Sequence, residues 1–330
     1  MKKRVFSGSR PTGYLHLGNY LGGVKGYLEL AQREDLETIY MVMDLHAITT
    51  PFNKEALSEN TRNVIIDYLA CGLDPKKSIV TVQSFVPEHT YLAHLISSTV
   101  TVARMLHLPT YKEKVKQYPQ DVTMALLNYP VLMAADILAY KAELVPVGID
   151  QEPHIEVARE IARKMNEKYG TDFPEPKRFA TEGEYIPSLT GEGKMSKSVE
   201  GSYIGLTDSL EEIKSKLAKV PTDSGSGKEI PKEGGVASLL KFVEIFLGKE
   251  KRKEYESSYL SSGIRYQELK TTLAEAIYSD LLPIQEKRRK IEKEKGYVED
   301  VIIDGAKKAR KIASEVLEEV KEKMGFMILK

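Results

Sequence analysis

The stretch of sequence that decides the fold reads Pro11-Thr12-Gly13-Tyr14-Leu15-His16-Leu17-Gly18-Asn19. It follows directly on the apolar run Arg4–Phe6, which we expect to form a strand. A strand, a Pro/Gly turn and then a helix place the helix start at the rim of a parallel sheet, where backbone N–H groups favour anions. His16 and Asn19 share one face of a first helical turn, so both could donate hydrogen bonds to one phosphate chain. A histidine at a helix start is more often a cap or a surface residue, and that alternative stays open.

Outward from this stretch, apolar β-rich runs alternate with amphipathic helical stretches over the first 200 residues. We expect further strands at 38–43, 78–83 and 143–147, and helices at 20–32, 54–70 and 152–169. This alternation is typical of an α/β fold with a doubly wound parallel sheet. From Ser209 and Glu212, which form a capping-box pattern, the periodicity becomes almost wholly helical, apart from a Gly/Ser/Pro-rich loop at 222–235.

The composition excludes several classes of protein. The 330 residues carry 48 Lys and Arg against 48 Asp and Glu, with one cysteine. A single cysteine excludes an internal disulfide and any multi-cysteine zinc or iron–sulfur cage, and the histidine spacings predict no zinc site. No apolar run approaches the roughly 20 residues that span a bilayer, and no secretory leader is apparent. We therefore expect a soluble, cytoplasmic protein without a membrane partner.

A second motif, Lys194-Met195-Ser196-Lys197-Ser198, follows the Gly-rich turn Gly191-Glu192-Gly193. Two lysines three residues apart on such a loop form a mobile cationic clamp, which can neutralise charge that develops on a pyrophosphate leaving group. For an arbitrary pentapeptide a solvated Lys/Ser loop would be the better interpretation.

His16-Leu17-Gly18-Asn19 followed by Lys194–Ser198 resembles the two signatures of class I aminoacyl-tRNA synthetases. The stretches Asp44–Thr49, Tyr129–Leu138 and Val145–Gln151 are similar to those of the tryptophanyl-tRNA synthetases, and the likeness extends over essentially the whole chain, more weakly in its helical half. The resemblance implies a Rossmann-like catalytic domain over 1–205, with a connective insertion at roughly 100–140 and a signature lysine loop at 191–200. It also implies a helical anticodon-binding domain over 206–330, whose last helix packs back on the catalytic domain.

The resemblance further implies the reaction: activation of L-tryptophan with ATP and Mg²⁺ to tryptophanyl-adenylate and pyrophosphate, then transfer to the 3′ end of a tRNA by a homodimer. The implied catalytic residues are His16 and Asn19 on the triphosphate and Lys194 and Lys197 on the leaving pyrophosphate. Lys112 or Lys114 could also reach ATP from the insertion. The other implied ATP-binding residues are Arg10, Pro11, Thr12, Gly18, Gly148, Ile149, Asp150, Ile186, Met195, Ser196 and Ser198.

The implied tryptophan pocket centres on Asp136, which lies in a largely apolar segment where an unpartnered carboxylate would be costly. An indole N–H only donates, so a fixed carboxylate is its natural partner; a carboxylate that pairs within the protein is the alternative. Met133 and Phe6 stand where tyrosine-specific relatives often have Gln and Tyr, which favours tryptophan. The remaining pocket residues are His46, Tyr129, Val145, Val147 and Gln151.

Two residues depart from the family's pattern: Ile149 replaces a common Glu, and Arg10 stands where many bacterial members carry Gln. A tyrosine-specific synthetase, a small nucleotidyltransferase of the same fold and a non-catalytic tRNA-binding paralogue remain alternatives. The last should have lost a signature, and both are intact.

The run Lys287-Arg288-Arg289-Lys290 is the best candidate for a contact with tRNA phosphates. Glutamates interleave with it, so a solvated helix face is an equally good interpretation. In contrast, Ser224–Lys228 lacks the spacing of a phosphate-binding P-loop, and we interpret it as a flexible linker.

Overall fold

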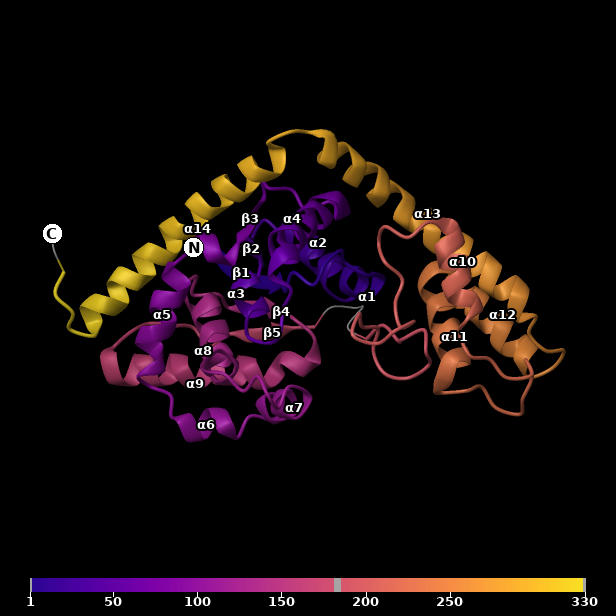
Figure 1. The fold of residues 1–330 in the computed structure, drawn as a ribbon, viewed down its shortest axis with the longest axis horizontal. Coiled ribbons are helices and arrows are strands. Elements are labelled where there is room, and N and C mark those ends of the chain that lie inside the picture. Colours follow the sequence, from indigo (N-terminus) through magenta and orange to yellow (C-terminus); the bar gives the residue numbers. More distant parts are fainter. Residues whose placement is uncertain (1, 181–184, 329–330) are drawn as a thin grey trace.

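The computed structural model describes residues 2–180 and 185–328 and contains a five-stranded parallel sheet (Figure 1). The strands follow the spatial order β3-β2-β1-β4-β5. Their bounds are β1 Lys3–Ser9, β2 Leu36–Val42, β3 Ser78–Val82, β4 Leu144–Pro146 and β5 Lys177–Phe179. The strand order reverses between β1 and β4, and in such sheets ligands bind outside the carboxyl ends of the strands at this switch point. The predicted doubly wound sheet is confirmed.

Side chains alternate along the strands, so each face of the sheet contributes to its own apolar core. Val5 and Tyr40 belong to a core shared with α2 and α4, whereas Phe6 and Ile39 belong to one shared with α5, α8 and α9. Burial on both faces explains why β2 reads as a nearly continuous apolar run. The elements of this first half are α1 Leu17–Asn19, η1 Tyr20–Val24, α2 Lys25–Ala31, α3 Asp44–Ala47, α4 Lys54–Cys71, η2 Gln83–Phe85, α5 Glu88–Ser97, α6 Val102–Leu106, α7 Pro109–Gln117, α8 Met124–Leu138, η3 Ile149–Gln151 and α9 Glu152–Tyr169.

The second half of the described chain is helical, as the periodicity predicts. Its helices are α10 Leu210–Ala218, α11 Gly234–Leu247, α12 Lys249–Tyr259, α13 Tyr266–Lys293 and α14 Tyr297–Lys323. The expected capping box at the start of α10 is present, with Ser209 Oγ accepting from the Glu212 N–H. Figure 1 shows α10–α13 beside the sheet domain, and α13 and α14 forming an arch that returns over it.

Helix α14 covers β3, the edge strand of the sheet. Thr81 Oγ1 donates a hydrogen bond to the Ile302 carbonyl at 2.8 Å. A Cβ atom on Gly305 would lie 2.0 Å from the Val80 carbonyl oxygen, so only glycine permits this close approach. The helix therefore protects backbone groups that an open edge would expose.

In the part of the chain that the structure describes, no helix is both long enough and apolar enough to cross a membrane.

Candidate active site

The first signature lies where β1 ends, at the switch point of the sheet. His16 is the N-cap of α1: its Nδ1 accepts from the Asn19 N–H at 3.3 Å, and Asn19 Oδ1 accepts from the His16 N–H at 3.1 Å. The predicted pair thus does cap the helix. Because Nδ1 is an acceptor, the neutral imidazole carries its proton on Nε2, and the Asn19 amide keeps its N–H donors. Both side chains can still donate to a ligand.

His16 is neutral at physiological pH. Burial, with Lys197 and Lys194 nearby, lowers its pKa to about 4. An uncharged imidazole with one available N–H suits a site that must bind a polyanion by hydrogen bonding and leave the charge compensation to lysines. Gly18 faces the ring, since a Cβ atom there would lie 3.0 Å from two atoms of the imidazole.

The lysine loop spans the switch point. Lys197 Nζ donates to the carbonyls of Tyr14 and, at 3.1 Å, Thr12, on the β1 side. Lys194 Nζ lies 3.9 Å from Asp150 Oδ1, on the β4 side, and its side chain is 45% exposed. The two lysines therefore flank the site from opposite sides, with one tethered to backbone and the other partly free.

Buried contacts anchor this loop between its lysines. Met195 is buried, and its N–H donates to the Ile186 carbonyl at 2.9 Å. The Ser196 N–H donates to Ser202 Oγ at 3.1 Å, and the Ser196 and Ser198 hydroxyls are 2.8 Å apart. Of the predicted loop residues, Ile186 and Met195 thus have structural contacts, whereas a ligand contact for them stays a prediction.

The turn Gly148-Ile149-Asp150 follows β4 and faces Lys194. A Cβ on Gly148 would lie 2.5 Å from Asp150 Oδ1 and 3.3 Å from Lys194 Nζ, so a larger residue would displace the Asp150 carboxylate and crowd the lysine. Ile149 is 66% exposed. An exposed side chain explains how the chain accommodates Ile in place of the family's common Glu.

A hydrogen-bond chain runs inward from Asp150. Gln151 Nε2 donates to Asp150 Oδ2 at 2.6 Å, so Gln151 Oε1 is left to accept from His154 Nδ1 at 3.0 Å. His154 Nε2 lies 2.7 Å from the Tyr129 hydroxyl. Burial lowers the pKa of His154 to about 4. The chain joins the ends of the predicted nucleotide site and the predicted tryptophan pocket, and the sequence analysis missed His154 although it stands one helical turn after Gln151.

Asp136 is fully buried and paired within the protein. Its Oδ2 accepts from His46 Nε2 at 2.8 Å, and its Oδ1 accepts from Gln83 Nε2 at 2.8 Å and His89 Nδ1 at 2.7 Å. Burial alone would raise the pKa of Asp136, but the hydrogen bonds from His46 and His89 outweigh it and hold the pKa at about 2. Pairing inside the protein, the alternative raised from the sequence, is therefore present. A ligand donor would have to reach Oδ2 beside His46, and the contact with an indole stays a prediction.

The apolar residues of the predicted pocket lie on the same side of the sheet. Phe6 is buried and stacks on Tyr140, with 5.3 Å between ring centres. Val145 belongs to the same buried core, whereas Met133 and Val147 are half-buried against it. The structure thus brings the predicted pocket residues to one region next to the switch point.

Two basic residues of the predicted ATP site, Arg10 and Lys114, affect each other's charge. Arg10 Nη2 donates to Thr50 Oγ1 at 2.8 Å and to the Ala47 carbonyl at 3.4 Å. Burial, followed by the charge of Arg10, lowers the pKa of Lys114, whereas Lys112 is exposed. Lys114 Nζ itself donates to Gln117 Oε1 at 2.8 Å. Pro11 and Thr12 form the turn between β1 and the first signature, the former buried and the latter exposed.

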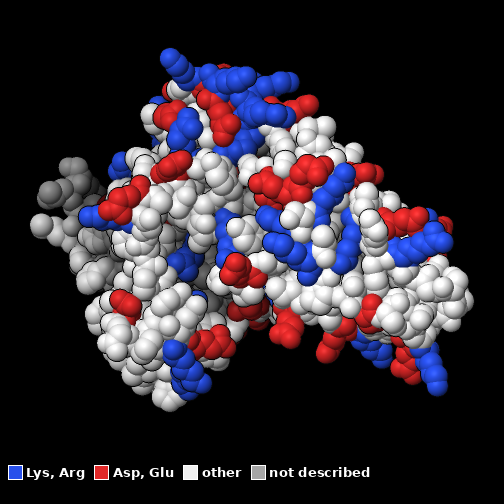
Figure 2. All heavy atoms as spheres, turned by 45° about the vertical axis from the view of Figure 1, so that its right-hand side comes forward, with Lys and Arg blue, Asp and Glu red and all other residues white. Residues whose placement is uncertain are grey.

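One residue of the basic run is misassigned by the sequence analysis. Arg288 is 4% exposed and forms an ion pair with Asp67 of α4, so it cannot contact tRNA phosphates. Lys287, Arg289 and Lys290 are exposed. Figure 2 shows Lys and Arg gathered at the top of the molecule, at the level where Figure 1 places the end of α13. The basic run thus predicts an exposed positive charge on α13, but the sequence of the run does not show which of its residues faces the interior.

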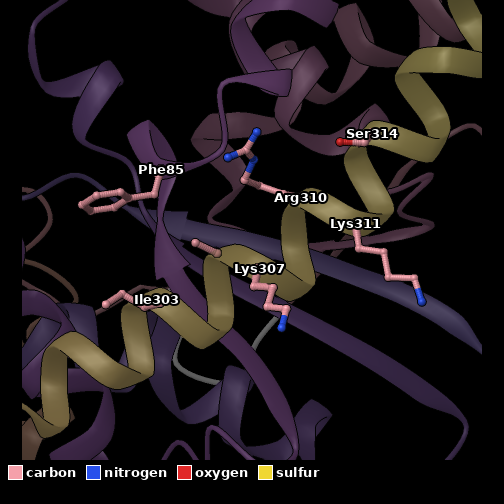
Figure 3. A pocket seen from close by; sticks show the side chains of 7 residues that line it. Phe85, Ile303, Lys307, Arg310, Lys311 and Ser314 are labelled. Atoms are coloured by element: carbon pink, nitrogen blue, oxygen red, sulfur yellow. The ribbon is translucent and has the colours of Figure 1, made fainter.

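A separate hollow of about 520 Å³ lies on α14 (Figure 3), lined by Phe85, Ile303, Ala306, Lys307, Arg310, Lys311 and Ser314. None of the predicted site residues lines it. Among residues 2–180 and 185–328, no three or more His, Cys, Asp or Glu side chains gather as metal ligands would.

Comparison with known proteins identifies the family to which this chain is similar. A family model described as tRNA synthetases class I (W and Y) matches residues 1–281. Two curated relatives, each named tryptophan–tRNA ligase, come from Deinococcus radiodurans (39% identical over 330 residues, 99% of each chain) and Thermotoga maritima (40% over 329 residues, 98% of this chain and 99% of the relative). The solved tryptophanyl-tRNA synthetase of Campylobacter jejuni, complexed with ADP and tryptophan, matches with a TM-score of 0.85 at 32% identity and covers 98% of this chain and 100% of that one. That of Mycoplasma pneumoniae matches with a TM-score of 0.86 at 29% identity and covers 99% of both. The resemblance drawn from the motifs is confirmed.

Proposed function

Since the chain belongs to the class I tRNA synthetases of the tryptophan and tyrosine (W and Y) family, we propose that it is a tryptophan–tRNA ligase. It forms tryptophanyl-adenylate and pyrophosphate from L-tryptophan and ATP, then transfers tryptophan to the 3′ end of its tRNA. The observation that carries the chemistry is the placement of Lys197 and Lys194 on opposite sides of the switch point, next to His16.

In the activation step, a tryptophan carboxylate oxygen attacks the α-phosphorus of ATP. The bond from that phosphorus to the bridging oxygen breaks, and pyrophosphate leaves with the electron pair. No protein side chain is covalently modified, so catalysis consists of positioning and charge stabilisation. Lys194 and Lys197 compensate the charge that grows on pyrophosphate, while His16 Nε2 and the Asn19 amide donate to the triphosphate.

Mg²⁺ enters as part of the substrate. We assign Mg²⁺ to the phosphates of ATP, whose charge it helps to neutralise. The exposed Asp150 carboxylate and Gly148 face the ribose, and the half-buried Gln151 borders the amino acid.

Tyrosine is the closest competing substrate, because a phenol hydroxyl can donate to Asp136 as an indole N–H can. The half-buried Met133, which offers a thioether in place of an amide, favours tryptophan. We further propose that the protein is a homodimer and is located in the cytoplasm, as the resemblance to the family implies.

The decisive experiment is ATP–pyrophosphate exchange with each of the twenty amino acids. Exchange that depends on tryptophan is expected. Preferential exchange with tyrosine would overturn the specificity, and no exchange with any amino acid would overturn the function.

A further inference from the structure

Helix α13 reaches the back of the first signature through a buried arginine. Arg288 Nη1 bonds Asp67 Oδ1 and, at 3.2 Å, the Asn63 carbonyl, while Nη2 donates to Asn63 Oδ1 at 2.7 Å. Its guanidinium carbon also lies 4.7 Å from the centre of the Tyr14 ring. One side chain from the helical part therefore contacts both α4 and the turn that precedes His16.

Asp67 passes this contact to the backbone of the signature. It is fully buried, and its Oδ2 accepts from the Leu15 N–H at 2.7 Å while Oδ1 is bound by Arg288. A buried carboxylate without a charged partner is strongly unfavourable. Arg288 thus stabilises an ionised Asp67, and Asp67 fixes the peptide one residue before His16.

Tyr14 connects the same arginine to the lysine loop. Arg288 lies over its ring, and its carbonyl accepts a hydrogen bond from Lys197 Nζ. The residue whose carbonyl binds Lys197 is therefore also in contact with α13 through its ring.

Gln285, one turn before Arg288 on α13, supports the other side of this segment. Its Nε2 donates to the carbonyls of Leu206 and Asp208, each at 2.9 Å. The Leu206 N–H in turn donates to the Leu15 carbonyl at 3.0 Å. The N–H of Leu15 is thus linked to α13 through Asp67, and the C=O of Leu15 is linked to the same helix through Leu206.

We propose that Arg288 is a positioning residue for the activation step: through Asp67 and Tyr14 it sets the spacing between His16 and Lys197 around the triphosphate. This inference rests on the proposed function, since the step it concerns is adenylate formation. It makes α13, a helix outside the sheet domain, part of the support of the ATP site. A salt bridge that merely joins the two halves would affect stability without affecting the activation rate.

The test is Arg288→Lys, which keeps a positive charge opposite Asp67 but loses the planar fork that reaches Asp67, Asn63 and Tyr14 together. We expect kcat for ATP–pyrophosphate exchange to fall by about 10²-fold, the scale for a displacement of reacting groups by about 1 Å. The Kd for L-tryptophan, measured from ligand fluorescence because the chain has no tryptophan, should not change. The matched control is Arg62→Lys: Arg62 lies on α4, the helix that Arg288 contacts, and its ion pair joins α4 to Glu299 of α14 at 2.8 Å instead of to the first signature. Its kcat should not change.

A double-mutant cycle separates positioning from stability. If Arg288 acts through the peptide that holds Lys197, adding Arg288→Lys to Lys197→Ala should lower kcat much less than Arg288→Lys does alone. Fully multiplicative effects, or an unchanged kcat in folded Arg288→Lys, would overturn the inference.

Should Arg288→Lys not fold, Tyr14→Ala replaces it, because the Tyr14 side chain is 43% exposed and its loss should be tolerated. It removes the ring under the guanidinium and keeps the carbonyl, so kcat should again fall, and an unchanged kcat would overturn the inference. Loss of exchange in the unaltered chain would instead refute the proposed function.

Discussion

The Nζ atom of Lys194 lies 3.9 Å from the carboxylate of Asp150, so the side chain of Lys194 extends across the switch point towards the turn after β4. Lys197, three residues later, is bound to the turn after β1. A triphosphate placed between the two turns would meet one cation from each side. Lys194 and Lys197 could then stay close to the pyrophosphate as it separates from the α-phosphate, without any rearrangement of the sheet.

Replacing Lys194 by alanine should lower the rate of adenylate formation far more than the affinity for ATP, because the charge that it compensates is greatest in the transition state. A loss of about 10²–10³-fold is the scale for removing one preorganised donor. Single-turnover measurements over a range of ATP concentrations separate the rate from the affinity. Lys249→Ala, at the exposed start of α12, is the control and should have no effect. Weakened ATP binding at an unchanged rate would show that the lysine binds ATP equally in the ground state.

Replacing Asp136 by asparagine should remove tryptophan selectivity together with activity. The asparagine side chain has the volume of aspartate but replaces one carboxylate oxygen by an NH₂ group. His46, Gln83 and His89, which all donate to the carboxylate of Asp136, therefore lose their common acceptor. In the unaltered chain, phenylalanine should exchange less efficiently than tryptophan, since it offers Asp136 Oδ2 no donor beyond the hydrogen bond from His46. Bound tryptophan should fluoresce at shorter wavelength than in buffer, and this shift should disappear in Asp136→Asn. Efficient exchange with phenylalanine would refute the pocket assignment.

Stability should fall as the pH drops from about 6.5 to about 4, because two buried histidines have lowered pKa values. The pKa of His16 and of His154 is about 4 in the folded chain, against 6.5 for an ordinary histidine. The unfolded chain therefore binds these protons first, and each histidine costs stability as the pH falls through this window. Burial raises the pKa of Asp67 to about 6, so protonation of this carboxyl in the folded chain offsets part, but not all, of the loss from the two histidines. Asp136, with a pKa lowered to about 2, loses its contribution only below about 4, the ordinary carboxyl range.

Urea unfolding between pH 7 and pH 4 measures this slope. His154→Gln should make this slope shallower, because the variant lacks one of the two buried histidines. An equal slope in His154→Gln and in the unaltered chain would contradict the lowered pKa.

Neutralising Lys287, Arg289 and Lys290 together should weaken tRNA binding and reduce its dependence on salt, because each phosphate contact releases counterions. Arg288 stays in this variant, since the structure makes it part of the folded interior. Adenylate formation should be unaffected. Replacing Lys249, Lys251 and Lys253 on α12 provides a control of equal charge. A salt slope equal to that of the unaltered chain would identify the run as a solvated helix face.

Patterns local in the chain predicted most of this fold. Strands β1–β4 and helices α4 and α9 lie at or near their expected residues, because burial on both faces or on one helical stripe leaves a periodic trace. Strand β5 was missed: its three residues Lys177–Phe179 are half-buried or exposed and carry two charges, so they leave no apolar pattern. Only pairing with β4 makes them a strand.

The site was predictable where residue type and order carry a signature, and unpredictable where the partners are distant in the chain. His16, Asn19, Lys194 and Lys197 are recognised by their spacing. The partners of Asp136 come from three other elements, and the ion pair of Arg288 with Asp67 joins residues 221 positions apart. Burial of such charges depends on which helix faces meet, and a single sequence does not record it.

The seal that α14 places over β3 has a consequence for synthesis of the protein. Strand Ser78–Val82 leaves the ribosome long before Tyr297–Lys323, so for most of translation the sheet has an unpaired edge. During that interval the nascent chain offers a template for strand addition by other chains. A chain released before α14 is made would lack the helix that approaches β3 at Gly305, so any sheet that it formed would keep its β3 edge open to other strands.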